Sequence, residues 1–354
     1  MTSVSEVASE RVRMLAFVLA LLVIPIHASG LSGAWMRGEV SVSVGVLVLN
    51  LLGSDTISRL AVPFFFVVSG FFLVKGLERE GLRRWWGRAL VKRSGTLLIP
   101  YLAWNLFYFV FKLATGKYGF EWKLASDQLV GWNLFNVPAC GQFWYVRCLL
   151  IYVIVAPLLV FLMRNLWLGA AILVIDCVCW FAGVKLFPFY IQPADLGYLL
   201  YFCGGLWLGL HLERVRSVLA FCQQKLRGPF AVVFAVGVMG VVWFSVTRSA
   251  ELAGLANKVM ILFGLATLWF YSDELMRMFG RWRSLFGLSF FIYAFHVILV
   301  SVAYKALSHA LPTEPYHSVG YVLKIAFAML GSLGVGVTLR RFMPRMYSVL
   351  CGGR

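Results

Sequence analysis

Long apolar segments recur along the whole chain, and they constrain its fold more than any other feature. About 20 mainly apolar residues are enough to cross a lipid bilayer as a helix, which satisfies its own backbone hydrogen bonds there. The sequence therefore predicts an all-α, polytopic transmembrane helical bundle. A shorter apolar stretch, 41–52, is expected to form an interfacial or re-entrant helix. We expect ten spans, at residues 14–30, 60–76, 95–113, 143–163, 166–184, 196–212, 229–247, 254–272, 285–305 and 318–339.

Charge supports the same fold class. Only 13% of the residues are charged, whereas a soluble domain carries about 25%. The net charge of +17 would suit a nucleic-acid-binding protein, but most of the lysines and arginines lie in short loops beside apolar segments. Alternate loops hold nearly all of them, which is the positive-inside pattern of membrane proteins. We therefore expect contacts with membrane lipid and no nucleic-acid partner.

The same pattern predicts the orientation of the chain. With ten spans and both termini cytoplasmic, every basic loop lies inside, and the expected outer loops are much poorer in positive charge. The expected parts are a cytoplasmic N-terminal segment (1–13), a transmembrane domain (14–340) and a cytoplasmic basic tail (341–354). The outer loops hold Arg37, Arg59, Lys117, Lys123, Lys185, Arg248 and Lys258.

Two other interpretations concern the N-terminus and the cysteines. Residues 1–30 could be a cleaved signal peptide, but Pro25 and His27 are unusual in such an apolar core. Removing this span would also leave an odd number of spans, which does not fit the loop charges.

The seven cysteines form no CxxC pair. Cys177 and Cys179 would point roughly 200° apart on a helix. We expect all seven to be structural, and we expect no metal site.

His27 is the strongest candidate for a catalytic residue. It lies inside the first expected span, where an ionisable group is costly and usually functional. Arg13 precedes it by 14 residues, which places both within roughly 40° of one helix face but about 21 Å apart. Arg13 could orient an anionic ligand at the inner membrane edge, or it could simply be a flanking arginine.

Four further segments contain candidate residues. His296 is a second histidine within a span, and Tyr293 precedes it by one helical turn. The aromatic Trp144 suits a sugar-binding platform or an interfacial belt, and Arg147 lies in the apolar run just after it.

Arg59 precedes the segment that contains Ser69. Clustered arginines bind phosphates, although topology alone also explains the basic loop 75–93, with its candidates Arg83, Arg84, Arg88, Lys92 and Arg93.

Taken in order, these segments resemble the acyltransferase-3 family of bacterial integral membrane acyltransferases. The most specific segment runs from Val62 to Leu73 and is similar to the family's P-x-F-F-x-x-S-G-F motif. Lys92-Arg93 before Leu98-Ile-Pro100-Tyr101, Phe143-Trp144-Tyr145 and Phe291-Ile-Tyr293 before His296 support it. The resemblance covers residues 10 to about 340. No C-terminal SGNH esterase-like domain, which some members carry, is expected here.

The resemblance implies a multi-pass enzyme of the bacterial cytoplasmic (inner) membrane. It implies transfer of an acyl group, most often acetyl, from cytoplasmic acyl-CoA to a hydroxyl of an envelope glycan, with no other cofactor. His27 would act as a general base or form an acyl-histidine intermediate, and the sequence leaves both routes open. The basic loop would bind acyl-CoA. Acceptor-binding or supporting roles would fall to Arg59, Ser69, Trp144, Arg147, Tyr293 and His296.

Two observations weigh on this interpretation. The family places an arginine before its first-span histidine with ten residues between the two, and here that position is Ala16, with Arg13 one turn earlier. The alternative function is a transporter or flippase for a glycan or another polar substrate, which would also have ionisable groups in its spans. Many transporters contain repeated halves with broken helices in matched positions, and the sequence shows no such repeat.

The orientation is tested by reporter fusions. We expect fusions after residues 85, 220 and 350 to report a cytoplasmic location, and fusions near 125 and 250 to report an outer one, because loop charge sets orientation. A reporter at 85 that lies outside, with the others unchanged, would overturn the span order.

Overall fold

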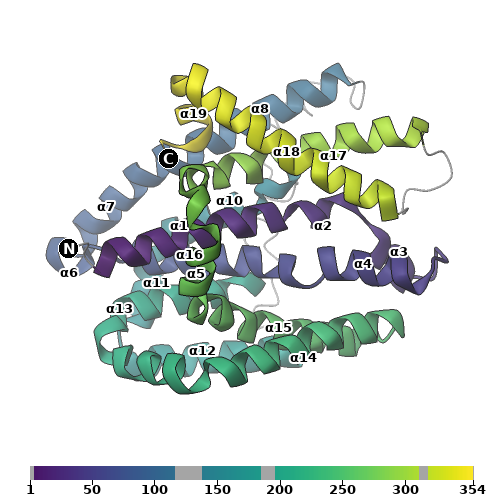
Figure 1. Cartoon of the computed structure of the whole chain (residues 1–354). Helices are drawn as coiled ribbons and strands as arrows, with labels where there is room; N and C mark the ends of the chain where they lie inside the picture. The colour runs from purple at the N-terminus through teal and green to yellow at the C-terminus, as the bar shows by residue number, and fades with distance from the viewer. Residues whose placement is uncertain (1–3, 116–137, 185–195, 311–317, 354) are drawn as a thin grey trace. The chain divides into compact units, whose positions relative to one another are not determined.

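The computed structural model describes residues 4–115, 138–184, 196–310 and 318–353, and these segments contain helices and no strand (Figure 1). Within these segments seven helices are long and apolar enough to cross a membrane, or eight when one bent pair, Gly141–Ile154 with Ala156–Met163, is counted as a single span. The chain is therefore a multi-pass helical membrane protein. The expected total of ten spans is not confirmed.

The difference in count has a physical basis in two places. One helical run, Leu199–Val246, has 48 residues and contains two of the expected spans. About 20 residues are enough for one crossing, so this run is longer than one crossing requires. The expected span 166–184 forms a helix of only 17 residues, Leu166–Ala182. The expected outer positions Lys117, Lys123 and Lys185 lie outside the described residues.

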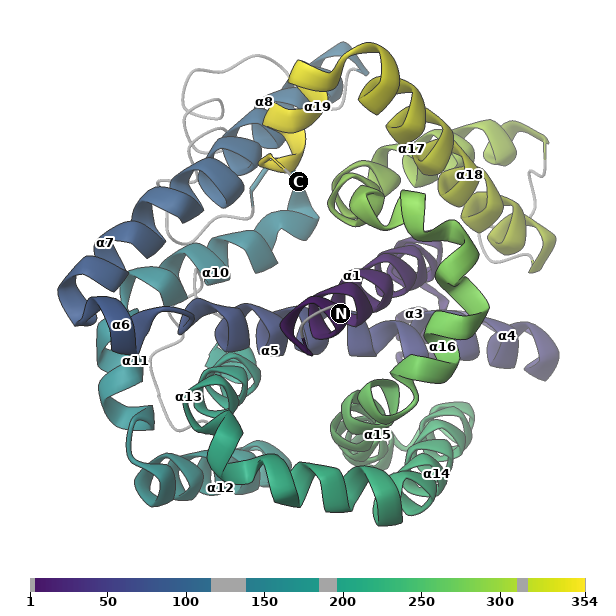
Figure 2. The same ribbon diagram turned by 60° about the vertical axis from the view of Figure 1, so that its left-hand side comes forward.

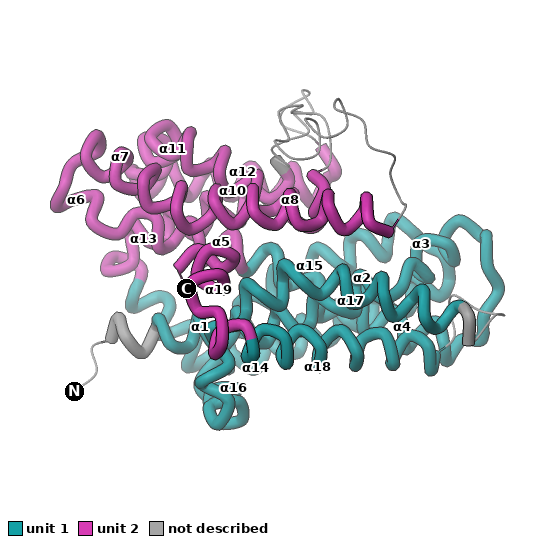
Figure 3. Tube along the Cα trace, turned by 90° about the horizontal axis from the view of Figure 1, so that it is seen from above, with its two compact units in different colours: residues 1–64, 216–338 teal, residues 65–215, 339–354 magenta. Residues whose placement is uncertain are grey.

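The helices form two compact units (Figure 3). Unit 1 comprises residues 1–64 and 216–338, and unit 2 comprises residues 65–215 and 339–354. The elements of unit 1 are α1 (Val4–Leu22), α2 (Ile24–Ala28), α3 (Leu31–Met36), α4 (Val44–Ser54), the 3₁₀ helix η1 (Ile57–Leu60), the π-helix η5 (Cys222–Leu226), α14 (Arg227–Val246), α15 (Ala250–Phe270), α16 (Ser272–Phe279), the 3₁₀ segment η6 (Gly280–Leu288), α17 (Ser289–Ala310) and most of α18 (Ser318–Phe342).

Unit 2 contains the remaining elements. They are most of α5 (Ala61–Leu73), α6 (Leu77–Glu80), α7 (Leu82–Arg93), the π-helix η2 (Ser94–Leu98), α8 (Ile99–Ala114), the 3₁₀ helix η3 (Gly141–Phe143), α10 (Trp144–Ile154), α11 (Ala156–Met163), α12 (Leu166–Ala182), the 3₁₀ helix η4 (Leu196–Tyr198), most of α13 (Leu199–Phe221) and α19 (Pro344–Cys351).

Local sequence explains several helix ends. Ser43 precedes α4, and its hydroxyl accepts a hydrogen bond from the Val46 amide. The side chain of Asn165 likewise accepts bonds from the first amides of α12, and Gly183 ends that helix in a left-handed conformation. Such caps satisfy backbone groups that the helix leaves unpaired at its ends. Pro100 lies in the first turn of α8, where a missing N–H does no harm.

The apolar stretch 41–52 does not form an isolated helix. It contributes to α4, which joins η1, α5 and α6 in one helical stretch of 37 residues, Val44–Glu80. Leu47 and Leu51 are buried against Leu31 of α3, with Trp35 and Val242 packed around them. This cluster attaches α3 and α4 to α14.

The basic segment 75–93, expected as a loop, is mostly helical. It forms α6 and α7, and α7 continues through η2 into α8 as one stretch of 33 residues, Leu82–Ala114. Arginine, lysine, leucine and alanine all favour helices, and residues 75–99 contain no proline. Gly76 and Gly81 adopt positive φ, so the chain turns only at these two residues.

The core of unit 1 is built around α1. This helix packs against α17, η6 and α16, and Phe17 meets Phe286 with ring centres 5.6 Å apart. Two ion pairs also join these elements: Arg11 with Asp273 at 2.5 Å and Glu10 with Arg283 at 2.8 Å. Helices α14 and α15 pack together along their lengths (Figures 1 and 2).

In unit 2, glycines bring α5 and α13 into backbone contact. A Cβ atom on Gly205 would coincide with the backbone of Val67, and one on Gly70 would meet the carbonyl of Phe202. Small residues allow such close approach, which holds helices together where the hydrophobic effect cannot. Gly204, the neighbour of Gly205, has no atom within 4 Å of an added Cβ.

This pair of glycines gives a matched test of the α5–α13 contact. Gly205→Ala should destabilise the protein, because the clash is with backbone that cannot rotate away; overpacking typically costs 1–3 kcal/mol. Gly204→Ala should leave stability nearly unchanged. Thermal unfolding of both variants in the same detergent measures the difference, and equal melting temperatures would contradict the contact.

Candidate functional site

His27 lies on α2, just after a break in the first span. Pro25 is in the first turn of α2 and has no N–H, so it cannot continue the hydrogen bonds of α1. The amide of Ile26 instead donates to the carbonyl of Val23 at 3.2 Å, a tighter pattern than that of an α-helix. His27 is an exposed residue two positions after this proline.

His296 lies beside His27. It belongs to α17, which packs against α2, and the two ring centres are 5.0 Å apart with planes inclined at 53°. The side chain of His296 is completely buried. Its Nδ1 lies 2.9 Å from the carbonyl oxygen of Ile292, one turn earlier on the same helix. The structure thus pairs one exposed and one buried histidine within unit 1.

The contact with Ile292 determines how a neutral His296 is protonated. A carbonyl only accepts hydrogen bonds, so Nδ1 of His296 carries the proton and donates it. In the neutral ring, Nε2 is then an acceptor. This atom is buried and makes no hydrogen bond to any part of the chain that the structure describes. An unsatisfied buried polar atom costs about 1–3 kcal/mol, so this nitrogen calls for an explanation.

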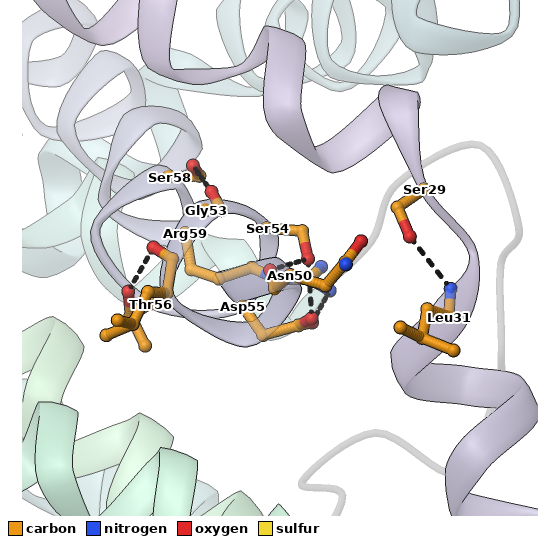
Figure 4. A network of polar contacts seen from close by, with 10 residues as sticks. Ser29, Leu31, Asn50, Gly53, Ser54, Asp55, Thr56, Ser58 and Arg59 are labelled. Carbon is orange, nitrogen blue, oxygen red and sulfur yellow. Dashed lines mark hydrogen bonds and ion pairs between the residues drawn. The ribbon is translucent and has the colours of Figure 1, made fainter. Parts of the chain in front are cut away.

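A second group of polar residues lies at the junction of α4 and η1 (Figure 4). Arg59 contacts Asp55 at 2.5 Å, and Ser54 donates to the other carboxylate oxygen at 2.8 Å. The same hydroxyl lies 2.6 Å from the carbonyl oxygen of Asn50, so its single proton is shared between the two acceptors. Both Asp55 oxygens are therefore engaged. The guanidinium of Arg59 is 43% exposed and close enough to His27 to act on it electrostatically.

Other predicted residues of unit 1 are less directly placed. Tyr293 is buried one turn before His296, with ring centres 6.5 Å apart. Arg13 is exposed on α1, and the structure gives no contact between it and His27. Arg11, which the helical spacing made the weaker candidate, is held by Asp273 and is part of the packing of α1.

The predicted residues of unit 2 lie in an aromatic cluster. Phe66 is fully buried and contacts Trp144, Tyr145 and Tyr198, with ring centres 4.7–6.4 Å apart. Trp144 and Tyr198 lie 5.0 Å apart. The hydroxyls of Ser69 and Tyr145 are 3.5 Å apart, and half-buried Arg147 follows Trp144 on α10.

The basic candidates on α7 fall into two groups. Arg88 is committed within the protein: it pairs with Glu80 at 2.8 Å and donates to the carbonyl of Lys75 at 2.9 Å, which closes the turn at Gly76. The exposed candidates are Arg83, Arg84 and Lys92, and half-buried Arg93 ends the helix. Arg84, Arg88 and Lys92 follow one another at intervals of four residues and therefore form one row.

No group of three metal-ligating side chains occurs within the described ranges, and none of the seven cysteines, all of which are described, forms a disulfide. Burial raises the pKa of the Cys140 thiol well above its usual range. A thiol needs its thiolate form to act as a nucleophile, so Cys140 is not suited to carry an acyl group.

Three features of these sites were missed from the sequence. Asp55 precedes Arg59 by four residues, a spacing that predicts an ion pair on a helix, and this signal could have identified it. The contact of Glu80 with Arg88 depends on the turn at Gly81. The pairing of His27 with His296 had no local signal, because it depends on the packing of α2 on α17.

The fold and the paired histidines define a multi-pass membrane protein with ionisable groups inside an apolar helical bundle. Residues 13–341 match the model of the acyltransferase-3 family, described as an acyltransferase domain. The chain belongs to this family, as its motifs indicated, and is an acyltransferase. No curated protein and no solved structure gives a match.

Family membership also defines the general reaction as acyl transfer to a hydroxyl acceptor within a membrane. It therefore favours the enzyme over the transporter considered from the sequence.

Proposed function

We propose that the protein transfers an acyl group, specifically acetyl, from cytoplasmic acyl-CoA to a hydroxyl of a cell-envelope glycan. The observation that carries the proposal is the exposed imidazole of His27 beside the buried ring of His296. An exposed ring can meet a substrate, and a buried neighbour can hold that ring in place. Family membership supplies the acyl transfer itself.

In the proposed reaction His27 is the general base. Its free ring nitrogen takes the proton of the acceptor hydroxyl while the oxygen attacks the thioester carbonyl. The carbon–sulfur bond then breaks, and the departing thiolate of CoA takes the proton back from His27. Arg59, which is exposed near His27, is placed to stabilise the negative charge that develops on the carbonyl oxygen.

The donor site is proposed on α7. Coenzyme A carries several phosphate charges, and arginine and lysine bind phosphate through charge-assisted hydrogen bonds. Arg83, Arg84 and Lys92 are exposed on this helix, and the structure gives them no ion pair. Arg88 has a structural task and is assigned to the turn rather than to the ligand.

The acceptor site is proposed at the aromatic cluster of unit 2. Sugar rings pack on aromatic faces, and half-buried Trp144 and Tyr198 present such faces next to each other. Ser69 and Arg147 supply hydrogen-bonding groups in the same unit. The proposed location is the bacterial inner membrane, with both termini in the cytoplasm, as the loop charge suggests.

The base is tested by His27→Ala. We expect acyl transfer to fall by about 10²–10⁴-fold, the usual loss of general acid–base assistance, while the protein stays folded and inserted. Acylation of envelope glycans is measured by mass spectrometry. The control is His211→Ala: His211 is a buried histidine of unit 2 whose ring bonds the backbone carbonyl of Met163, and it has no role in the proposed reaction. Near-normal acylation by stable His27→Ala protein would rule out the base.

The donor site is tested by replacing Arg83, Arg84 and Lys92 together with Gln. Charge-assisted hydrogen bonds contribute roughly 1.5–3 kcal/mol each, so the apparent KM for acyl-CoA should rise at least tenfold with little loss of thermal stability. Arg88→Gln should do the reverse, because it opens the turn at Gly76. Unchanged saturation curves for the triple variant in the same lipid would limit α7 to a topological role.

A further inference from the structure

The orientation of the His296 ring is fixed by its surroundings. The ring is completely buried, and its Nδ1 is held by the Ile292 carbonyl at 2.9 Å. Tyr293 flanks it on the same helix. A neutral ring held in this way presents its Nε2 lone pair in one direction only. No described atom of the protein donates a hydrogen bond to that lone pair.

His27 provides the ring that Nε2 can reach. Each imidazole nitrogen lies about 1.2 Å from its ring centre, so an N–H···N bond of about 2.9 Å joins rings whose centres are about 5.3 Å apart. The observed separation is 5.0 Å. The separation of the two rings therefore suits an N–H···N hydrogen bond between them.

In many active sites a carboxylate orients the catalytic histidine. Here one oxygen of Asp55 binds Arg59 and the other is in contact with Ser54, and the structure gives no contact of Asp55 with either histidine. The buried imidazole is the group with a vacant acceptor.

We infer that His296 is the positioning residue of the catalytic base: its Nε2 accepts the N–H of His27 and so fixes the tautomer of that ring. The inference rests on the proposed role of His27. The nitrogen of His27 that faces His296 carries the proton, and the other nitrogen keeps its lone pair for the acceptor hydroxyl. When His27 takes the hydroxyl proton, its bond to Nε2 becomes charge-assisted and stronger.

Two amide substitutions separate this role from simple packing. In His296→Gln, the longer side chain can place an amide oxygen, which accepts hydrogen bonds, near the position of Nε2. In His296→Asn, the shorter amide can still donate to the Ile292 carbonyl but offers no acceptor at the Nε2 position. A packing role predicts equal effects, or a milder effect for the variant that keeps the Ile292 bond. A positioning role predicts rescue by Gln alone.

The expected result is a fall in kcat of about 10²-fold for His296→Asn, comparable to the loss from a misplaced catalytic group. We expect His296→Gln to stay within a few-fold of the wild type. KM for the acceptor should change little in either variant. Equal kcat values for the two variants, with both proteins folded, would overturn the inference.

A spectroscopic measurement tests the same point without relying on turnover. In ¹⁵N-histidine-labelled protein in lipid, solid-state NMR distinguishes the two tautomers, and His27→Ala identifies the His27 signals. We expect one tautomer of His27 in the wild type and in His296→Gln, and a mixture in His296→Asn. His211→Asn is the matched control and should leave the His27 signals unchanged. A mixture in the wild type, or one tautomer in His296→Asn, would refute the inference.

The two proposals can fail separately. Full acylation by His27→Ala would remove the base, whereas the tautomer of His27 would still show whether His296 fixes it. Loss of acylation in His27→Ala together with equal kcat values for His296→Asn and His296→Gln would keep the base and remove the positioning residue.

Discussion

The packing of α2 against α17 brings two imidazole rings together in an apolar bundle, and the proposed chemistry depends on this contact. His27 is exposed, whereas His296 is buried and its Nδ1 is held by the Ile292 carbonyl. In the proposed mechanism, their contact combines access to a substrate with control of the ring that meets it. Buried polar groups are costly, so the helices around them must pack well enough to hold them.

The packing of unit 2 shows how helices can associate in lipid. Without a hydrophobic driving force, close packing of small residues holds them together. Gly70 and Gly205 place the backbones of α5 and α13 in contact. Phe66 lies on α5 between these contacts and the aromatic rings of α10 and η4. The close backbone contact and the aromatic cluster therefore share one helix.

The sequence predicted the helical class and the family, and it marked both histidines as candidates, because each leaves a local signal: apolar length, a motif or an ionisable residue in an apolar run. It did not predict that His27 and His296 meet, since their separation in the chain carries no information about helix packing. The segment 75–93 was expected as a loop because its charge suggested one, but its residues also favour helix. Its candidate arginines were all expected to bind acyl-CoA, but Arg88 instead forms an ion pair with Glu80.

The break before α2 has a consequence for how motifs of this kind are compared between proteins. Residues in a 3₁₀ turn advance by about 20° more than residues in an α-helix, and the bond from Ile26 to Val23 introduces such a turn between α1 and His27. The angular position of side chains around the helix axis therefore shifts across Pro25. The number of residues between an arginine at the start of α1 and His27 does not determine their relative direction. A search pattern that fixes this spacing would reject chains, such as this one, whose arginine lies one turn earlier.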